Sequence, residues 1–176
     1  MKQPILAIVG SAPNALDDLY GFLESLLPLP DRNVDVMAIG LDAVKRIKGS
    51  VRYITTNHPE DIPAIVAEMH RIGCGDYQLI CHLPGHQVDI VEPYRPPLGR
   101  SGSSAMTGTL AALRMGYDRI VLCGCPLTGN APEGNPYEAF RLGWEDRKEE
   151  LLGKVRSVSG WTRELLGAPT EDWLNG

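Results

Sequence analysis

Short apolar runs alternate with segments of helical periodicity along most of the chain. The runs have the length of strands, and runs that are apolar throughout are typical of strands buried on both faces of a parallel sheet. The segments between them repeat apolar residues at intervals of three and four, as amphipathic helices do. The sequence therefore predicts an α/β fold, Rossmann-like and doubly wound, with a mainly parallel sheet of about five to six strands flanked by helices. The expected strands are 4–9, 34–39, 51–55, 77–81 and 119–123.

The 176 residues are expected to form a single domain. Two segments interrupt the alternation: 82–100 is rich in Pro and Gly and is predicted to be an irregular loop excursion, and 126–137 to be a lid-type loop. A C-terminal helical tail is predicted to pack on the domain or on a second copy, so a homo-oligomer is one expected assembly. The expected helices before this tail are 16–27, 41–47, 59–73, 103–115 and 137–155.

The charge balance is that of an acidic globular protein. Lys and Arg number 17 against 22 Asp and Glu, which gives a formal net charge of −5 and an isoelectric point near 5.3. Nucleic acid is not an expected partner, because the sequence has no basic field for a phosphate backbone. The apolar runs are shorter than the roughly 20 residues of a membrane span, and residues 1–4 lead into a strand without a signal-peptide pattern. A cytoplasmic protein without a membrane span is expected.

Four cysteines, Cys74, Cys81, Cys123 and Cys125, lack the paired CxxC spacing of a structural zinc site. Cys81 and Cys123 lie within apolar runs, where a cysteine behaves as a small buried hydrophobic residue. The spacing of Cys123 and Cys125 is interpreted as packing rather than as a redox pair. We therefore expect reduced thiols, no metal site and no resident cofactor of fixed identity.

The turn after the first expected strand is suited to binding an anion. Gly10, Ser11, Ala12, Pro13 and Asn14 join this strand to a helix, so the helix N-terminus and its backbone N–H groups face the carboxyl edge of the sheet. Gly10 allows a ligand to approach the backbone, and Ser11 and Asn14 add side chains that form hydrogen bonds. The alternative is an ordinary turn in which Ser11 caps the helix. The segment is not a GxGxxG fingerprint, so neither nicotinamide nor flavin binding is indicated.

A second turn of the same kind opens the helix predicted over 103–115. Ser101, Gly102, Ser103 and Ser104 supply three hydroxyl groups and a glycine, which is more than one helix cap requires. The alternative is that these serines only cap the helix. Because strand ends converge where the strand order reverses, Ser11 and Ser103 are predicted to line the same cleft.

The two turns together resemble those of a known superfamily. The turn from Gly10 to Asn14 is similar to the GxGPS turn of bacterial sialyltransferases of the Campylobacter type and of the related MptE-like proteins, formerly called DUF115. The segment from Ser101 to Gly124 resembles their (T/S)SG, helix, GY, strand, G-x-D segment. In those families both segments border a nucleotide, which is CMP-sialic acid in the transferases and ATP in the pyrophosphokinases. The resemblance implies that Gly124 and both turns contact a nucleotide or nucleotide sugar.

Several positions depart from this family pattern. Ala12 and Asn14 replace a glycine and a serine, and the acid after the late strand is missing, because Cys125 is followed by Pro126. The paired aspartates of a metal-dependent pyrophosphokinase have no counterpart, so Mg²⁺ is not an expected cofactor. The departures favour binding over phosphoryl transfer assisted by Mg²⁺.

Two histidines are the candidate catalytic residues. His58 follows the third expected strand and His82 the fourth, so both imidazoles are expected at the carboxyl edge of the sheet, where a general base would act. Thr56 and Asn57, which precede His58, are candidate ligand-binding residues. The alternative is that His58 caps the helix that begins at Pro59 and that His82 fills a polar loop.

These residues predict a nucleotide- or nucleotide-sugar-binding protein, acting as a transferase on a nucleotide-activated donor. The two turns would hold phosphate and ribose, and His58 or His82 would deprotonate an acceptor hydroxyl. The resemblance also implies that Asp42, which lies where the family has an Asn-containing turn, would contact the ribose or base. Two alternatives stay open: a non-catalytic nucleotide-binding or accessory module, and a pyrophosphokinase-like phosphotransferase. Pro126, in place of the acid, favours the non-catalytic module.

Overall fold

The computed structural model describes residues 4–27, 33–93, 103–129 and 137–176. Within these residues, seven strands form one sheet, and all pairs of neighbouring strands are parallel. The order across the sheet is β5-β4-β3-β2-β1-β6-β7. The α/β, Rossmann-like fold class is therefore as predicted. The strands are β1 (Ile5–Val9), β2 (Val34–Ile39), β3 (Tyr53–Thr56), β4 (Gln78–Cys81), β5 (Ile90–Val91), β6 (Ile120–Cys123) and β7 (Val155–Ser157).

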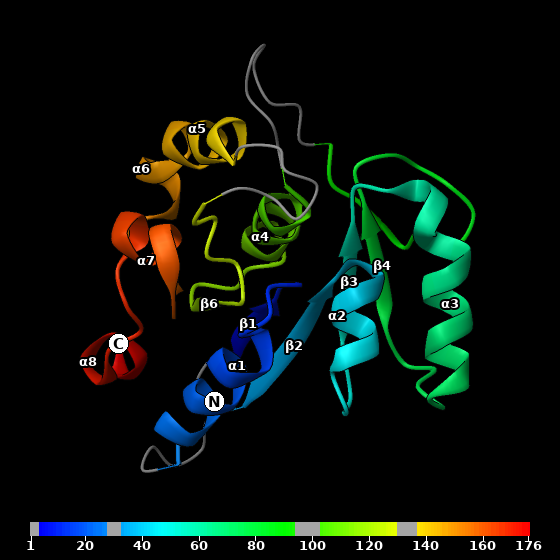
Figure 1. Ribbon diagram of the computed structural model, residues 1–176, viewed down its shortest axis with the longest axis horizontal. Coiled ribbons are helices and arrows are strands. Elements are labelled where there is room, and N and C mark those ends of the chain that lie inside the picture. Colours follow the sequence, from blue (N-terminus) through cyan, green and yellow to red (C-terminus); the bar gives the residue numbers. More distant parts are fainter. Residues whose placement is uncertain (1–3, 28–32, 94–102, 130–136) are drawn as a thin grey trace.

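Helices cover both faces of the sheet, so the molecule has three layers (Figure 1). One apolar core joins α1, α2, α3 and α8 to one face, and a second core joins α4, α5, α6 and α7 to the other. Within the described residues, no helix is long and apolar enough to cross a membrane. The helices are α1 (Ala15–Ser25), α2 (Gly40–Arg46), the 3₁₀ turn η1 (Pro59–Asp61), α3 (Ile62–Arg71), α4 (Ser104–Arg114), α5 (Glu138–Asp146), α6 (Lys148–Leu151), α7 (Gly160–Leu166) and α8 (Glu171–Asn175).

β1 lies at the centre of the fold, between β2 and β6. Its residues are at most 1% exposed. Leu6 and Ile8 belong to the core that contains α4, whereas Ile5, Ala7 and Val9 belong to the core on the opposite face. Because both faces are buried, the strand shows no alternation of polar and apolar residues, which is the pattern that the sequence predicts.

The winding of the sheet reverses at β1. The strands from β1 to β5 follow one another across the sheet, and the chain then returns through α4 and adds β6 on the other side of β1. In sheets of this kind, ligands bind beyond the carboxyl ends of the strands that flank such a switch point. Gly10 follows β1 at this point, and Gly124 follows β6.

The helix α4 lies close to the sheet because the side that faces the sheet contains small residues. A Cβ atom at Gly108 would lie 2.6 Å from Met37 Sδ and 2.7 Å from Thr55 Cγ2, closer than such atoms approach in proteins. Only glycine permits this depth of packing at position 108. The packing brings the first turn of α4 against the end of β3.

The sheet has seven strands rather than the five to six predicted. Both additional strands are short and lie at the edges. β5 has two residues and lies in the predicted irregular segment 82–100, of which 94–100 fall outside the described residues. β7 has three residues and begins at the end of the helix predicted over 137–155. Sequence periodicity does not reveal strands this short, because two or three residues are too few to show an apolar pattern.

Two short helices, α5 and α6, replace the single helix predicted over 137–155. Gly153, with a φ of 84°, turns the chain from α6 into β7. α7 and α8 form the C-terminal tail, and buried Leu166 and Leu174 pack it on the rest of the chain. Of the lid-type loop predicted over 126–137, residues 130–136 fall outside the described residues.

Candidate functional site

The turn after β1 packs against the turn after β6. The Gly10 N–H donates to the Cys123 carbonyl at 2.8 Å, and the Ala12 N–H donates to the Gly124 carbonyl at 3.4 Å. A Cβ atom on Gly10 would lie 2.2 Å from the Gly124 carbonyl oxygen and 2.8 Å from Cys125 Sγ. This close backbone approach requires glycine at position 10, whether or not a ligand binds.

Asp18 of α1 holds these turns together. Its Oδ2 accepts hydrogen bonds from the Gly124 N–H at 2.8 Å and from Ser159 Oγ at 2.6 Å, and its Oδ1 accepts one from Asn14 Nδ2 at 3.2 Å. Asp18 is 9% exposed, and hydrogen bonds of this kind stabilise a buried carboxylate. Gly10–Asn14, Asp18, Gly124 and Ser159 are called the β1–β6 junction below.

Sequence reasoning missed Asp18. The available signal was its position four residues after Asn14, which places the two side chains on one side of the helix. It also missed Arg46, which ends α2 and donates its Nη1 to the carbonyls of Ser11 at 2.7 Å and Ala12 at 3.0 Å. Arg46 therefore places a cation beside the turn in which the sequence predicts anion binding.

The side chains of the first turn divide between the junction and the surface. Ser11 and Pro13 are exposed, whereas Asn14 also donates its Nδ2 to Ser159 Oγ at 3.2 Å. The N-cap of α1 is Asn14, so the alternative in which Ser11 caps this helix is not observed.

A second polar group forms where the end of β3 meets the start of α4. The Asn57 N–H donates to Ser104 Oγ at 2.9 Å, and Thr107 Oγ1 donates to Asn57 Oδ1 at 2.8 Å. Thr55 Oγ1 also donates to the Ser104 carbonyl at 3.5 Å. Asn57, Ser104 and Thr107 are called the β3–α4 cluster. Two predicted ligand-binding residues, Asn57 and Ser104, are thus in contact although 47 positions separate them in the sequence.

Ser103 caps α4, because its Oγ accepts a hydrogen bond from the Met106 N–H at 3.2 Å. The capping alternative is therefore what the structure shows for this serine. Ser101 and Gly102 fall outside the described residues. The N-terminus of a helix carries a partial positive charge, so the cluster lies at a point of favourable potential for an anion.

His58 lies next to this cluster and is paired with Glu60. The distance from its Nδ1 to Glu60 Oε1 is 3.2 Å, and the two side chains are 65% and 70% exposed. A hydrogen bond from its own backbone, followed by the one from His58, holds the pKa of Glu60 below its usual value. Thr56 Oγ1 accepts a hydrogen bond from the His58 N–H at 3.0 Å. His58 is the N-cap of η1, but its side chain does not cap it.

His82 follows β4, and its charge lowers the pKa of Glu60, an effect smaller than those of the two hydrogen bonds and of the His58 charge. The His82 Nδ1 lies 3.8 Å from Cys81 Sγ, so His82 contacts a buried thiol on its other side. Asp42 lies in the first turn of α2 and is exposed.

The predicted residues thus fall into two regions of the carboxyl edge. β2 lies between β1 and β3, so the ends of β1 and β3 are about 10 Å apart at roughly 4.8 Å per strand. The start of α4 is bonded to the β3 side of this gap. That Ser11 and Ser103 line one cleft stays a prediction.

All four cysteines are free thiols. Burial raises the pKa of Cys125 to about 12 and that of Cys123 well above its usual value, which keeps both thiols protonated. Among the residues that the structure describes, no three His, Cys, Asp or Glu side chains are grouped so as to hold a metal ion.

Comparison with protein-family models, with curated proteins and with solved structures finds no match for this chain. The functional argument therefore depends on the side chains at the carboxyl edge of the sheet. These provide a positive helix terminus, hydroxyl and amide groups, an exposed imidazole paired with a carboxylate, and an arginine about two strands away.

Proposed function

We propose that this chain binds a nucleotide or a nucleotide sugar along the carboxyl edge of its sheet, between the β1–β6 junction and the β3–α4 cluster. The observation that carries the proposal is the cluster itself. It sets an amide and two hydroxyl groups at the positive end of an 11-residue helix. Such groups bind phosphate and ribose oxygens in proteins.

The separation of the two regions supports an elongated ligand. A molecule that contacts both must span roughly 10 Å, which suits a phosphate at one region and a sugar or base at the other. Arg46 is available at the junction end, because its partners there are neutral carbonyl groups. A phosphate would give this guanidinium a stronger, charge-assisted hydrogen bond. The resemblance of the two turns to those of nucleotide-binding families adds to this argument.

The proposed reaction is transfer of a group from a nucleotide-activated donor to a hydroxyl, with His58 as the general base. Donation from Nδ1 to Glu60 leaves a lone pair on Nε2. This Nε2 would take the proton of the acceptor hydroxyl. The hydroxyl oxygen would bond to the transferred group while the bond between that group and the nucleotide breaks. Glu60 orients the imidazole and stabilises its protonated form. His82 is the other candidate base, but a thiol contacts its Nδ1 instead of a carboxylate.

A non-catalytic nucleotide-binding module is the second candidate. The observation that favours it lies after β6, where Gly124 is followed by Cys125 and Pro126 rather than by an acid. The Cys125 thiol has a pKa raised to about 12 by burial, so it does not replace the missing carboxylate. A pyrophosphokinase-like reaction would need acids to hold its metal, and the described residues contain no group of side chains that could do so.

Binding and product formation separate these candidates. Calorimetry with CMP, CTP, ATP and nucleotide sugars tests binding by the intact protein, and product formation from the donor that binds tests transfer. The transferase proposal expects His58→Ala to keep donor affinity and to lower turnover by about 10²- to 10⁴-fold. His70→Ala, on an exposed face of α3, is the matched control and should change neither.

Binding without product in the wild-type protein would establish the non-catalytic module. Failure of all these nucleotides to bind would refute both candidates. Equal turnover by wild type and His58→Ala would remove His58 as the base.

A further inference from the structure

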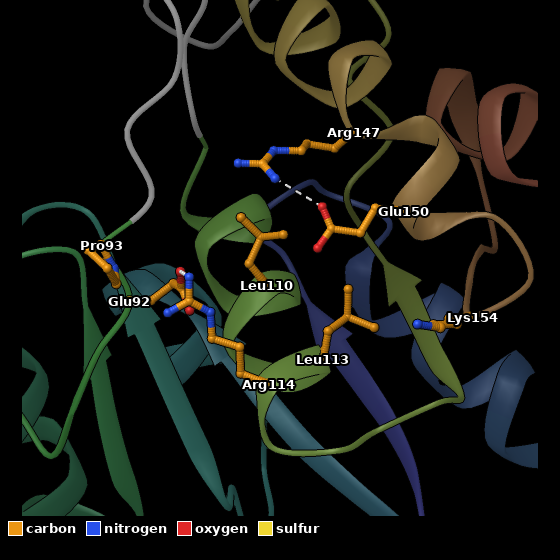
Figure 2. A pocket seen from close by; sticks show the side chains of 8 residues that line it. All are labelled: Glu92, Pro93, Leu110, Leu113, Arg114, Arg147, Glu150 and Lys154. Carbon is orange, nitrogen blue, oxygen red and sulfur yellow. Dashed lines mark hydrogen bonds and ion pairs between the residues drawn. The ribbon is translucent and has the colours of Figure 1, made fainter.

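A pocket of about 400 Å³ lies on the α4 side of the sheet, apart from the carboxyl-edge residues described above. In Figure 2, α4 lies between the two charged sides of the pocket, and its Leu110 and Leu113 line the pocket between them. One side carries Glu92 and Arg114, and the other carries charged side chains of the α6 region. Its volume lies within the usual range for small-molecule sites, roughly 300–1,000 Å³. The lining residues are Glu92, Pro93, Leu110, Leu113, Arg114, Arg147, Glu150 and Lys154.

Glu92 distinguishes this pocket from an ordinary surface groove, because it is a buried carboxylate in the pocket lining. Its side chain is 1% exposed, and its Oε1 forms an ion pair with Arg114 at 3.2 Å but receives no hydrogen bond of acceptable geometry. Desolvation raises the pKa of this carboxyl, in spite of the opposite effect of the Arg114 charge. A buried carboxylate oxygen normally accepts at least one hydrogen bond, so Oε1, which is itself buried, has unused acceptor capacity.

The opposite side of the pocket has an excess of positive charge. Arg147 forms an ion pair with Glu150 at 3.0 Å, whereas Lys154 has no ion-pair partner among the residues that the structure describes. The backbone of Lys154 is fixed by two hydrogen bonds, with Ile120 and Leu151. Its exposed side chain lines the pocket, and no carboxylate of the described residues pairs with its ammonium group.

From this arrangement we infer that the pocket binds a small anion that also carries a hydroxyl group, such as a hydroxylated organic phosphate or carboxylate. The acidic group binds at Lys154, beside Arg147. The hydroxyl donates a hydrogen bond to Glu92 Oε1, and the carbon atoms of the ligand pack on Leu110 and Leu113.

The donor at Glu92 is a hydroxyl rather than an ammonium group, because Arg114 already balances the carboxylate charge. A second cation there would be repelled by Arg114 at short range. A neutral hydroxyl supplies the missing hydrogen bond without changing the charge at this end. The leucines between the two ends favour a ligand with a carbon skeleton over an inorganic ion.

Glycerol 3-phosphate, inorganic phosphate and glycerol are the probes, because the last two are the separate halves of the first. Calorimetry should show glycerol 3-phosphate binding at least about fivefold more tightly than inorganic phosphate, the effect of one neutral hydrogen bond. Lys154→Met should weaken both phosphates by about tenfold or more, as loss of a charged hydrogen bond does. Lys48→Met, an exposed lysine that does not line the pocket, is the matched control.

Glu92→Leu should remove the advantage of glycerol 3-phosphate over phosphate, and Glu92→Gln, which keeps an oxygen acceptor, should retain part of it. Amide shifts on titration should occur at Leu110, Leu113 and Lys154. Equal affinity of the two phosphates for wild type, or full affinity in Lys154→Met, would overturn the proposal. So would shifts confined to Asn57 and Ser104, which would place the phosphate at the proposed nucleotide site instead. His58→Ala should leave glycerol 3-phosphate binding unchanged.

Discussion

The β1–β6 junction and the β3–α4 cluster lie at the same edge of one sheet, yet their polar groups have different roles. In the junction, Gly124 contacts both Gly10 and Asp18, and the buried carboxylate uses both oxygens within the protein. Beside the cluster, the His58 and Glu60 side chains are 65% and 70% exposed. A glycine turn at a switch point can thus serve mainly to close the fold, while side chains suited to chemistry lie one or two strands away.

The largest effect should follow from placing a methyl group in the junction. Gly10→Ala puts a Cβ atom 2.2 Å from the Gly124 carbonyl oxygen, so the two turns must separate. We expect a loss of about 3 kcal/mol of unfolding free energy, measured by urea denaturation. Gly21→Ala is the control, because a Cβ at Gly21 meets no atom within 4 Å and alanine favours the helix. A Gly10→Ala protein as stable as wild type would show that the junction is not closely packed.

A smaller loss should follow from removing the carboxylate of the junction. Asp18→Ala leaves the buried Gly124 N–H without its acceptor, which costs about 2 kcal/mol. The neighbouring Asp17 is exposed, so Asp17→Ala should change the unfolding free energy by less than about 0.5 kcal/mol. Urea denaturation of both variants makes the comparison. If the two losses were equal, Asp18 would not be the residue that joins these turns.

The smallest stability effect should occur in the β3–α4 cluster. Thr107→Val keeps the side-chain shape and removes the hydroxyl that donates to Asn57 Oδ1, for an expected loss of about 1 kcal/mol. Affinity for the nucleotide that binds should fall about fivefold, because Asn57 is no longer held in place. Thr107→Ser, which keeps the hydroxyl, should retain the affinity. Calorimetry and urea denaturation together test whether the cluster affects binding more than folding, and unchanged affinity in Thr107→Val would contradict this.

The central strands were predictable because each is marked by an apolar run of neighbouring residues. Ile5–Val9 is apolar throughout and followed by a glycine, which is typical of a strand buried on both faces. The turn at Gly10 and the helix start at Ser103 were found in the same way, from glycine and hydroxyl residues at element boundaries. β5 and β7 were missed because their two and three residues carry no period.

The partners within the site were less predictable, because they join distant parts of the chain. The contact of Asp18 with Ser159 spans 141 positions, and that of Arg46 with Ser11 spans 35. No periodic pattern links such residues, and only the strand order brings them together. The sequence also does not reveal that Gly10 is needed for contact with Gly124, since a glycine required by a neighbouring backbone looks the same as one required by a ligand.

The central position of β1 has a consequence for synthesis on the ribosome. β1 pairs with β2, which ends at residue 39, and along its other edge with β6, which ends at residue 123. At about 5–20 residues per second, roughly 4–17 s separate the arrival of these two partners. In that interval one edge of nascent β1 offers unpaired backbone groups on an apolar strand, which is a template for association with other chains. The growing polypeptide is therefore most vulnerable to aggregation while its second half is still being translated.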